Sequence, residues 1–148
     1  MELYLRRATI EDAEDILKWR NDPATRENSF TRDEIDLETH LAWFEKKLVD
    51  TGCFMYILMD GDKKVGNIRV DVEDVTGEIS YMIAPDARRK GYGKKILALV
   101  ETEVSGMVDS LVGYTLKTNR ASGRCFEANG YTCRDDGDSY CYIKQFKA

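Results

Sequence analysis

The segment Pro85-Asp86-Ala87-Arg88-Arg89-Lys90-Gly91-Tyr92-Gly93-Lys94-Lys95 carries most of the information about the fold of this chain. Its two glycines, one residue apart, lie between a predicted strand and a predicted helix, and five of the eight residues from Arg88 to Lys95 are basic. Glycine allows backbone N–H groups to turn toward a bound anion, and the dipole of the following helix adds to the attraction. The segment therefore predicts either an anion-binding loop or a glycine-started helix with a solvated basic face.

The anion that such a loop would hold is a polyphosphate. Cations in the first turn of a helix oppose its dipole by about 0.3–1 kcal/mol each, and a multiply charged anion would offset that cost at Lys94 and Lys95. The loop is not a Walker A sequence, because no Gly-Lys-Ser/Thr follows the glycines. It is not the dinucleotide fingerprint either, because Ile96 stands where that motif has its third glycine.

The composition of the chain bounds its class. With 148 residues, of which 43% are hydrophobic and 33% charged, residues 1–148 are expected to form one domain with a real core. The net charge of −5 argues against a nucleic-acid partner. The longest apolar run, Cys53 to Met59, is too short to span a membrane. Because the first residues contain no apolar signal segment, we expect a cytoplasmic protein.

The cysteines and the single histidine do not predict a metal site. Cys53, Cys125, Cys133 and Cys141 include no C-x-x-C pair, and His40 is the only imidazole, whereas a structural zinc site needs paired ligands at short spacing. We therefore expect reduced cysteines that serve as small apolar side chains, and no bound metal.

Hydrophobic periodicity predicts an α/β (α+β) fold. Helical spacing indicates helices near 10–21, 37–48, 91–104 and 120–129, the last capped by Gly130, with residues 24–32 as a loop or broken helix. Strand patterns occupy 3–8, 53–59, 68–72, 78–84, 111–116, 131–133 and 140–146. We expect a mixed, mostly antiparallel sheet of about seven strands with about four helices. A crossover helix makes strands 78–84 and 111–116 parallel.

Two motifs resemble the GNAT superfamily of N-acetyltransferases. Arg88-x-x-Gly91-x-Gly93 matches the loop with which that family binds the pyrophosphate of acetyl-CoA, and the run from Asn119 to Tyr131 is similar to its second motif. The element order matches along essentially the whole chain. The resemblance implies a single-domain GNAT fold, with a splayed parallel strand pair and a bulge in the strand before the loop.

The resemblance also implies where acetyl-CoA would bind. Backbone groups of Met82 and Ala84 would pair with the pantetheine arm, and the amides from Arg89 to Lys94 would hold the pyrophosphate. Asn119 and Ser122 would lie near the thiol end. The expected donor-binding set is Met82, Ile83, Ala84, Arg88, Arg89, Lys90, Gly91, Tyr92, Gly93, Lys94, Asn119, Ser122 and Phe126.

Direct acetyl transfer to an amine needs a base, because an alkylamine with a pKa of about 10 is protonated at neutral pH. Glu78 is the best candidate, directly or through a water, although a solvent-facing charge at a strand end is the alternative. Many relatives carry a tyrosine where this chain has Phe126. Tyr81 lies on the opposite strand face from Glu78, and Tyr131 is expected in the core. The proton donor to the leaving thiolate is then Ser122 or water, or the thiolate leaves without a proton donor.

The acceptor is less defined. Arg20, Asn21, Arg26, Ser29, His40 and Trp43 are similar to residues of acetyltransferases of nucleotide-linked amino sugars, and Arg20, Arg26 and Arg32 could meet the sugar diphosphate. A protein N-terminal α-amine of the ribosomal type, polyamines, aminoglycosides and other small amines are the alternatives. A structural role for His40, a non-catalytic acyl-CoA-binding module and a homodimer also stay open.

Overall fold

In the computed structural model, which describes residues 2–30 and 32–146, the strands form one sheet in the order β1-β2-β3-β4-β5-β7-β6. Only the β4–β5 pair is parallel among the described pairs, as the sequence predicts. The strands are β1 (Leu3–Arg7), β2 (Cys53–Asp60), β3 (Lys63–Glu73), β4 (Thr76–Ile83), β5 (Ser110–Leu116), β6 (Thr132–Asp136) and β7 (Ser139–Gln145). The helices are α1 (Ala13–Arg20), α2 (Pro23–Glu27), α3 (Leu37–Val49), α4 (Tyr92–Val104) and α5 (Arg120–Ala128), with 3-10 turns η1 (Ile10–Asp12) and η2 (Pro85–Ala87).

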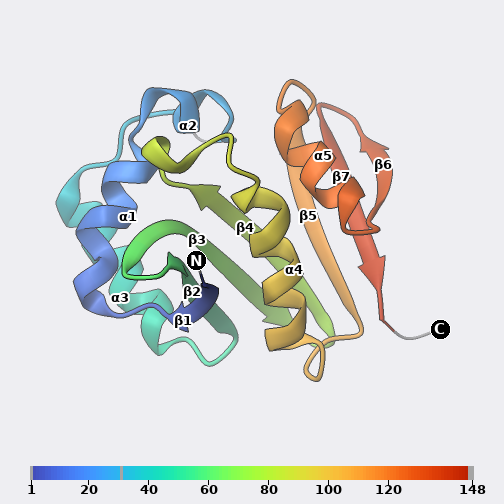
Figure 1. The fold of residues 1–148 in the computed structure, drawn as a ribbon, viewed down its shortest axis with the longest axis horizontal. Coiled ribbons are helices and arrows are strands. Elements are labelled where there is room, and N and C mark those ends of the chain that lie inside the picture. The colour runs from blue at the N-terminus through green and yellow to red at the C-terminus, as the bar shows by residue number, and fades with distance from the viewer. Residues whose placement is uncertain (1, 31, 147–148) are drawn as a thin grey trace.

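The parallel pair splays, which confirms the expectation for this fold. β4 pairs with β5 from Thr76↔Ser110 to Ile79↔Gly113 and no further, although both strands continue. Figure 1 shows the two strands close together at one end and diverging toward the end flanked by α2 and α5. The backbone edge of β4 after Ile79 is therefore left without a neighbouring strand.

The expected bulge in β4 is wrong. Pairing between β3 and β4 runs without a register shift from Glu73↔Thr76 to Gly66↔Ile83, and the irregularity lies instead in β2, between Leu58 and Met59. Side chains of an uninterrupted strand alternate between the two faces of a sheet. Glu78 and Ser80 therefore share one face of β4, and Tyr81 points to the other.

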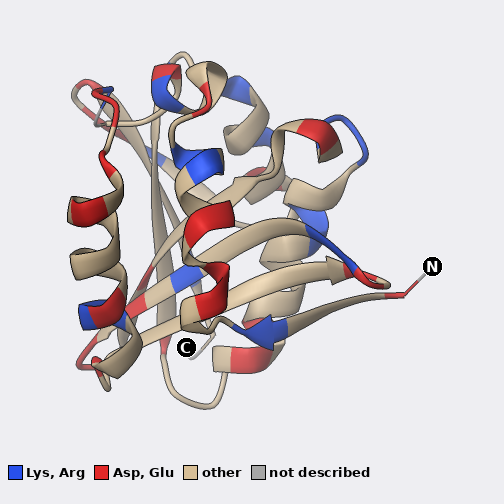
Figure 2. Ribbon diagram, turned by 90° about the vertical axis from the view of Figure 1, so that its left-hand side faces the viewer, with Lys and Arg blue, Asp and Glu red and all other residues tan. Residues whose placement is uncertain are grey.

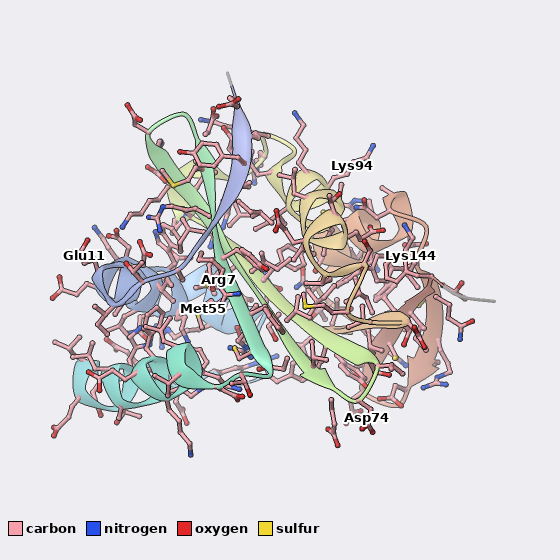
Figure 3. All side chains as sticks on the ribbon, turned by 90° about the horizontal axis from the view of Figure 1, so that it is seen from below. Arg7, Glu11, Met55, Asp74, Lys94 and Lys144 are labelled. Atoms are coloured by element: carbon pink, nitrogen blue, oxygen red, sulfur yellow. The ribbon has the colours of Figure 1, made fainter. Side chains whose placement is uncertain are left out.

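Helices cover both faces of the sheet. α4 packs its stripe of Ile96, Leu97, Val100 and Val104, all fully buried, on one face. α3 buries Phe44 on the other. Figure 3 shows α3 and α4 on opposite sides of the strands, with Lys94 labelled at the start of α4. None of the helices that the described residues form is long and apolar enough to cross a membrane.

The region expected to be a loop or broken helix contains the short helix α2, so the protein has five α-helices among its described residues rather than about four. Asp22 caps α2, because its Oδ2 accepts from the Thr25 N–H at 3.3 Å, and Pro23 occupies the first helical turn. Proline is pre-organised for that position. Pro23 thus ends α1 and begins α2 at once.

Candidate active site

The loop before α4 presents a run of free backbone donors. Among the described residues, none of the N–H groups from Arg89 to Lys94 makes a hydrogen bond, and the first bond of α4 is from Lys95 N to Gly91 O at 3.3 Å. Arg89 (φ 64°) and Gly91 (φ 80°) both adopt left-handed conformations, which turn successive amides toward a common concavity. Figure 2 shows the basic residues gathered in this loop. The arrangement suits a phosphate-bearing ligand.

The two glycines of the loop serve different purposes. A Cβ at Gly91 would meet nothing within 4 Å, so glycine is needed there for its positive φ. A Cβ at Gly93 would lie 2.9 Å from the Cys125 sulfur, so Gly93 lets α4 pack closely on α5. Gly91 shapes the loop and Gly93 positions it against the rest of the site.

Several side chains of the loop bind the protein rather than open space. The Arg88 guanidinium donates to Asp22 Oδ2 at 2.8 Å and to Thr25 Oγ1 at 2.7 Å. The Tyr92 hydroxyl donates to Asp60, where that contact raises the pKa of the phenol. Arg88 and Tyr92 are therefore occupied within the protein, whereas the amides and the exposed side chains of Arg89, Lys90 and Lys94 are open to a ligand.

The backbone groups at the free edge of β4 are not those of Met82 and Ala84, which we expected to pair with the pantetheine arm. The Ala84 N–H donates to Val65 O at 2.9 Å, and the backbone groups of alternate residues in an antiparallel strand point the same way. Those of Met82 and Ala84 therefore face β3. The backbone groups of Tyr81 and Ile83 face the gap beside β5 and are the ones available to a pantetheine arm.

A groove of about 440 Å³ occupies the split between β4 and β5. It brings together the predicted residues Glu78, Asn119, Ser122, Phe126 and Ser29 from three parts of the chain, and it adds residues that sequence reasoning did not select. Its lining consists of Asn28, Ser29, Phe30, Glu78, Ile79, Ser80, Tyr81, Tyr114, Asn119, Ser122 and Phe126.

Glu78 is exposed and, among the described side chains, makes no hydrogen bond or ion pair. It lies directly opposite Asp71 on β3, a like-charge pairing that costs stability. Asp71 is neutralised by Lys47 Nζ at 2.9 Å and Arg69 Nε at 2.8 Å. Burial opposes ionisation of Asp71, but these contacts outweigh it and lower its pKa. Glu78 is thus the carboxylate of the pair that has no hydrogen-bond or ion-pair partner among the described side chains.

A hydroxyl pair lies on the other side of the same groove. Tyr81 Oη and Ser122 Oγ are 2.8 Å apart, and the Tyr81 ring meets Phe126 edge-on with centroids 5.9 Å apart. Burial raises the pKa of the Tyr81 phenol, so the phenol keeps its proton at neutral pH. On the sequence alone, Tyr81 is set aside as a proton donor because it lies on the opposite strand face from Glu78, which is the α4 side of the sheet.

Of the six residues expected to bind the acceptor, only Ser29 lines this groove. His40 is fully buried, with Nε2 bonded to Ala13 O at 2.8 Å and Nδ1 facing Arg20 at 3.0 Å, and burial lowers its pKa. His40 therefore has the structural role, as a neutral imidazole. The Trp43 ring lies under the guanidiniums of Arg20 and Arg69, at 4.6 and 5.0 Å.

The remaining two acceptor candidates are occupied as well. Asn21 makes two hydrogen bonds to the backbone of Ile35, at 2.7 and 2.8 Å. Arg26 Nε donates to Asn21 O at 3.2 Å. These contacts brace the segment between α1 and α3, so the two side chains support the site rather than line it.

Comparison with known proteins assigns the family. The acetyltransferase (GNAT) domain family matches residues 2–132. The chain is 31% identical over 111 residues to the uncharacterized N-acetyltransferase YfmK of Bacillus subtilis (strain 168), covering 74% of this chain and 75% of YfmK. The chain belongs to the GNAT acetyltransferase family and is an acetyl-CoA-dependent N-acetyltransferase.

Solved structures share the fold at low sequence identity. A domain from Methanocaldococcus jannaschii DSM 2661 has a TM-score of 0.86 at 20% identity, over 98% of this chain and 99% of that one. The spermidine N-acetyltransferase from Vibrio cholerae, in complex with CoA and spermine, has a TM-score of 0.86 at 15% identity, over 97% and 95%. The free amides of the loop fit CoA in this chain too, because they supply unsatisfied donors around open space.

Proposed function

We propose that this protein transfers the acetyl group of acetyl-CoA to a small cationic amine, with Glu78 as the base. The observation that carries the proposal is the run of free amides from Arg89 to Lys94, which opens beside the split where Glu78 lies. Those amides would hold the pyrophosphate, and the gap-facing backbone of Tyr81 and Ile83 would hold the pantetheine arm.

The charge around Glu78 supports a cationic acceptor. A second groove, of about 610 Å³, shares Glu78 with the first and opens on the α3 side. Its charged lining is Lys47, Asp50, Asp71, Glu73, Asp74 and Glu78. Five carboxylates against one ammonium attract a positively charged amine and repel a sugar diphosphate. The relative from Vibrio cholerae was solved with spermine, which has this chemistry.

The nucleotide-linked amino sugar expected from the sequence finds less support. That expectation has Arg20, Arg26 and Arg32 meet the phosphates. Arg20 faces His40 and Trp43, and Arg26 binds Asn21, so only Arg32 of the three is exposed without a partner among the described residues. Breaking these contacts would expose buried partners at a cost of about 1–3 kcal/mol for each orphaned group. We therefore place a polyamine or a polyamino sugar ahead of a nucleotide sugar.

Within this site, Glu78 takes the proton that the incoming ammonium must lose, directly or through a water. The neutral nitrogen then attacks the thioester carbon held in the split. The site accelerates the reaction by holding both reactants in line, so the transfer needs no covalent enzyme intermediate.

The experiment is acetyl-CoA turnover on a panel of amines, read as free thiol. The panel contains spermidine, kanamycin, a UDP-linked amino sugar and a peptide with a free α-amine. We expect the first two to be acetylated fastest, with a mass gain of about 42 Da. Turnover only with the nucleotide sugar would overturn the acceptor class, and calorimetry that shows no CoA binding would overturn the whole proposal.

A further inference from the structure

We infer that the phenol of Tyr81 donates the proton that the CoA sulfur takes as it leaves. The inference rests on the proposed acetyl transfer and names a catalytic residue in it. Tyr81 lines the groove in the split and places its Oη 2.8 Å from Ser122 Oγ on α5. Ser122 is the residue that the family motif places near the thiol end of CoA.

Tyr81 lies on the opposite strand face from Glu78, as an acid and a base that act on opposite sides of the acetyl group must. The split joins the two faces of the sheet, so an amine can meet Glu78 on the α3 side while the donor enters from the α4 side, where its loop lies. The base must face the nitrogen and the acid must face the sulfur, and these atoms lie on opposite sides of the carbonyl carbon. A carbonyl carbon held in the split would therefore have Tyr81 on one side and Glu78 on the other.

The packing of Phe126 explains why the proton-donating hydroxyl comes from Tyr81 on β4 rather than from a tyrosine at position 126. A Cβ placed on Gly113 would lie 2.3 Å from Phe126 Cζ, so the tip of the ring touches the β5 backbone. A hydroxyl on that Cζ would collide with the strand. The Tyr81 ring packs edge-on against Phe126 and brings a hydroxyl into the same groove from the facing strand.

The protons of the reaction are accounted for by Glu78, Tyr81 and solvent. The ammonium loses two protons: Glu78 passes both to solvent, one before the N–C bond forms and one after. As the C–S bond breaks, Tyr81 gives its proton to sulfur. Burial raises the pKa of Tyr81, and a hydrogen bond from Ser122 to the phenolic oxygen offsets part of that rise and supports the phenolate. Solvent then reprotonates Tyr81, so one proton is released per turnover.

The test combines turnover with two readouts on binding. Tyr81→Phe should lower kcat about 100-fold, which is the lower end of general-acid contributions, with CoA affinity by calorimetry unchanged within twofold. Tyr4→Phe removes a phenol hydroxyl on β1, outside both grooves, and should change kcat less than twofold. Tyr81→3,5-difluorotyrosine should give a fluorine resonance that shifts when CoA is added, whereas the same replacement at Tyr4, on β1, should not respond.

Three outcomes separate the alternatives. An active wild type with an unchanged Tyr81→Phe variant would overturn the inference and leave the proposed function intact. A loss with Ser122→Ala as large as with Tyr81→Phe would make Ser122 the donor instead. A wild type without turnover on any amine would overturn the function itself, and the fluorine response to CoA would then report only on binding.

Discussion

Arg88, the first basic residue of the loop before α4, binds Asp22 at 2.8 Å, although 66 residues separate them in the chain. Asp22 is also the cap of α2. One carboxylate therefore holds both the helix on one flank of the split and the loop that would hold the pyrophosphate. The side chain of Arg88, a residue of the expected donor-binding set, anchors the loop in this structure.

The Arg88–Asp22 pair should contribute little stability, because its side chains are 35% and 22% exposed and such pairs contribute about 0–1 kcal/mol. Arg88→Ala should lower the free energy of unfolding by about 1 kcal/mol or less, and Asp22→Ala should lower it further because it also removes the cap of α2. Urea denaturation of the two single variants and the double variant measures the coupling. Strict additivity would show that the ion pair contributes nothing.

Gly91→Ala should weaken CoA binding. Its left-handed φ costs about 1–2 kcal/mol for a residue with a Cβ, and relief of that strain would turn the amides away from the concavity, for about a tenfold loss of affinity. Gly61→Ala is the matched control, because Gly61 also has a positive φ and open space but lies in the turn after β2. Calorimetry should find equal destabilisation in the two variants and weaker CoA binding only in the first.

Gly93→Ala should destabilise the protein through packing. Its Cβ would meet the Cys125 sulfur at 2.9 Å, and overpacking of this kind costs about 1–3 kcal/mol. Cys125→Ala removes the sulfur, so the double variant should recover part of the loss. Thermal melts of all four proteins test this, and a double variant less stable than the sum of its parts would contradict the packing account.

Glu78→Gln should lower kcat about 100-fold, because the amide cannot accept the proton of the ammonium. CoA affinity should not change, since Glu78 lies on the acceptor side of the split. Glu103→Gln, at an exposed position on α4, is the control. Full turnover by the Glu78 variant on the best amine would remove this residue from the mechanism.

Asp12 makes stability depend on pH. Its buried carboxylate binds Arg6 at 2.9 Å and Lys64 at 2.7 Å. Burial opposes ionisation, but these bonds and the Thr9 N–H hold the pKa of Asp12 far below its usual range. A depressed folded-state pKa gives stability that is present above the unfolded value near 4 and is lost as the pH falls below it. Asp12→Asn should therefore cost about 3 kcal/mol at pH 7 and progressively less below pH 4 in urea melts. Asp15→Asn, at a half-exposed partner of Lys64, should cost under about 1 kcal/mol.

Local signals in the sequence predicted the order and type of nearly all elements. The alternation of apolar and polar residues predicted β3 and β4. The apolar stripe of α4 and the cap at Gly130 (φ 86°) also lie where the sequence predicts them. Helix α2 was not predicted as a distinct helix because its five residues are too few to show a helical period of apolar residues.

The site was harder to predict than the fold. Which backbone groups of β4 face the split depends on a strand register that composition does not encode. The sequence resemblance therefore assigns the pantetheine pairing to Met82 and Ala84, includes Ile83 in the donor-binding set without that role, and leaves Tyr81 out. The acceptor residues were hard to select for a similar reason, because the sequence does not show that Arg20, Asn21 and His40 have partners within the protein. Only tertiary contacts show which polar side chains are already occupied.

The two-sided opening of the sheet also bears on the order of events during turnover. With the donor entering from the α4 side and the amine from the α3 side, neither molecule obstructs the route of the other. The acetylated product can then diffuse away while CoA is still seated, or the reverse. Initial-velocity plots should intersect rather than run parallel, and each product should inhibit competitively against its own precursor.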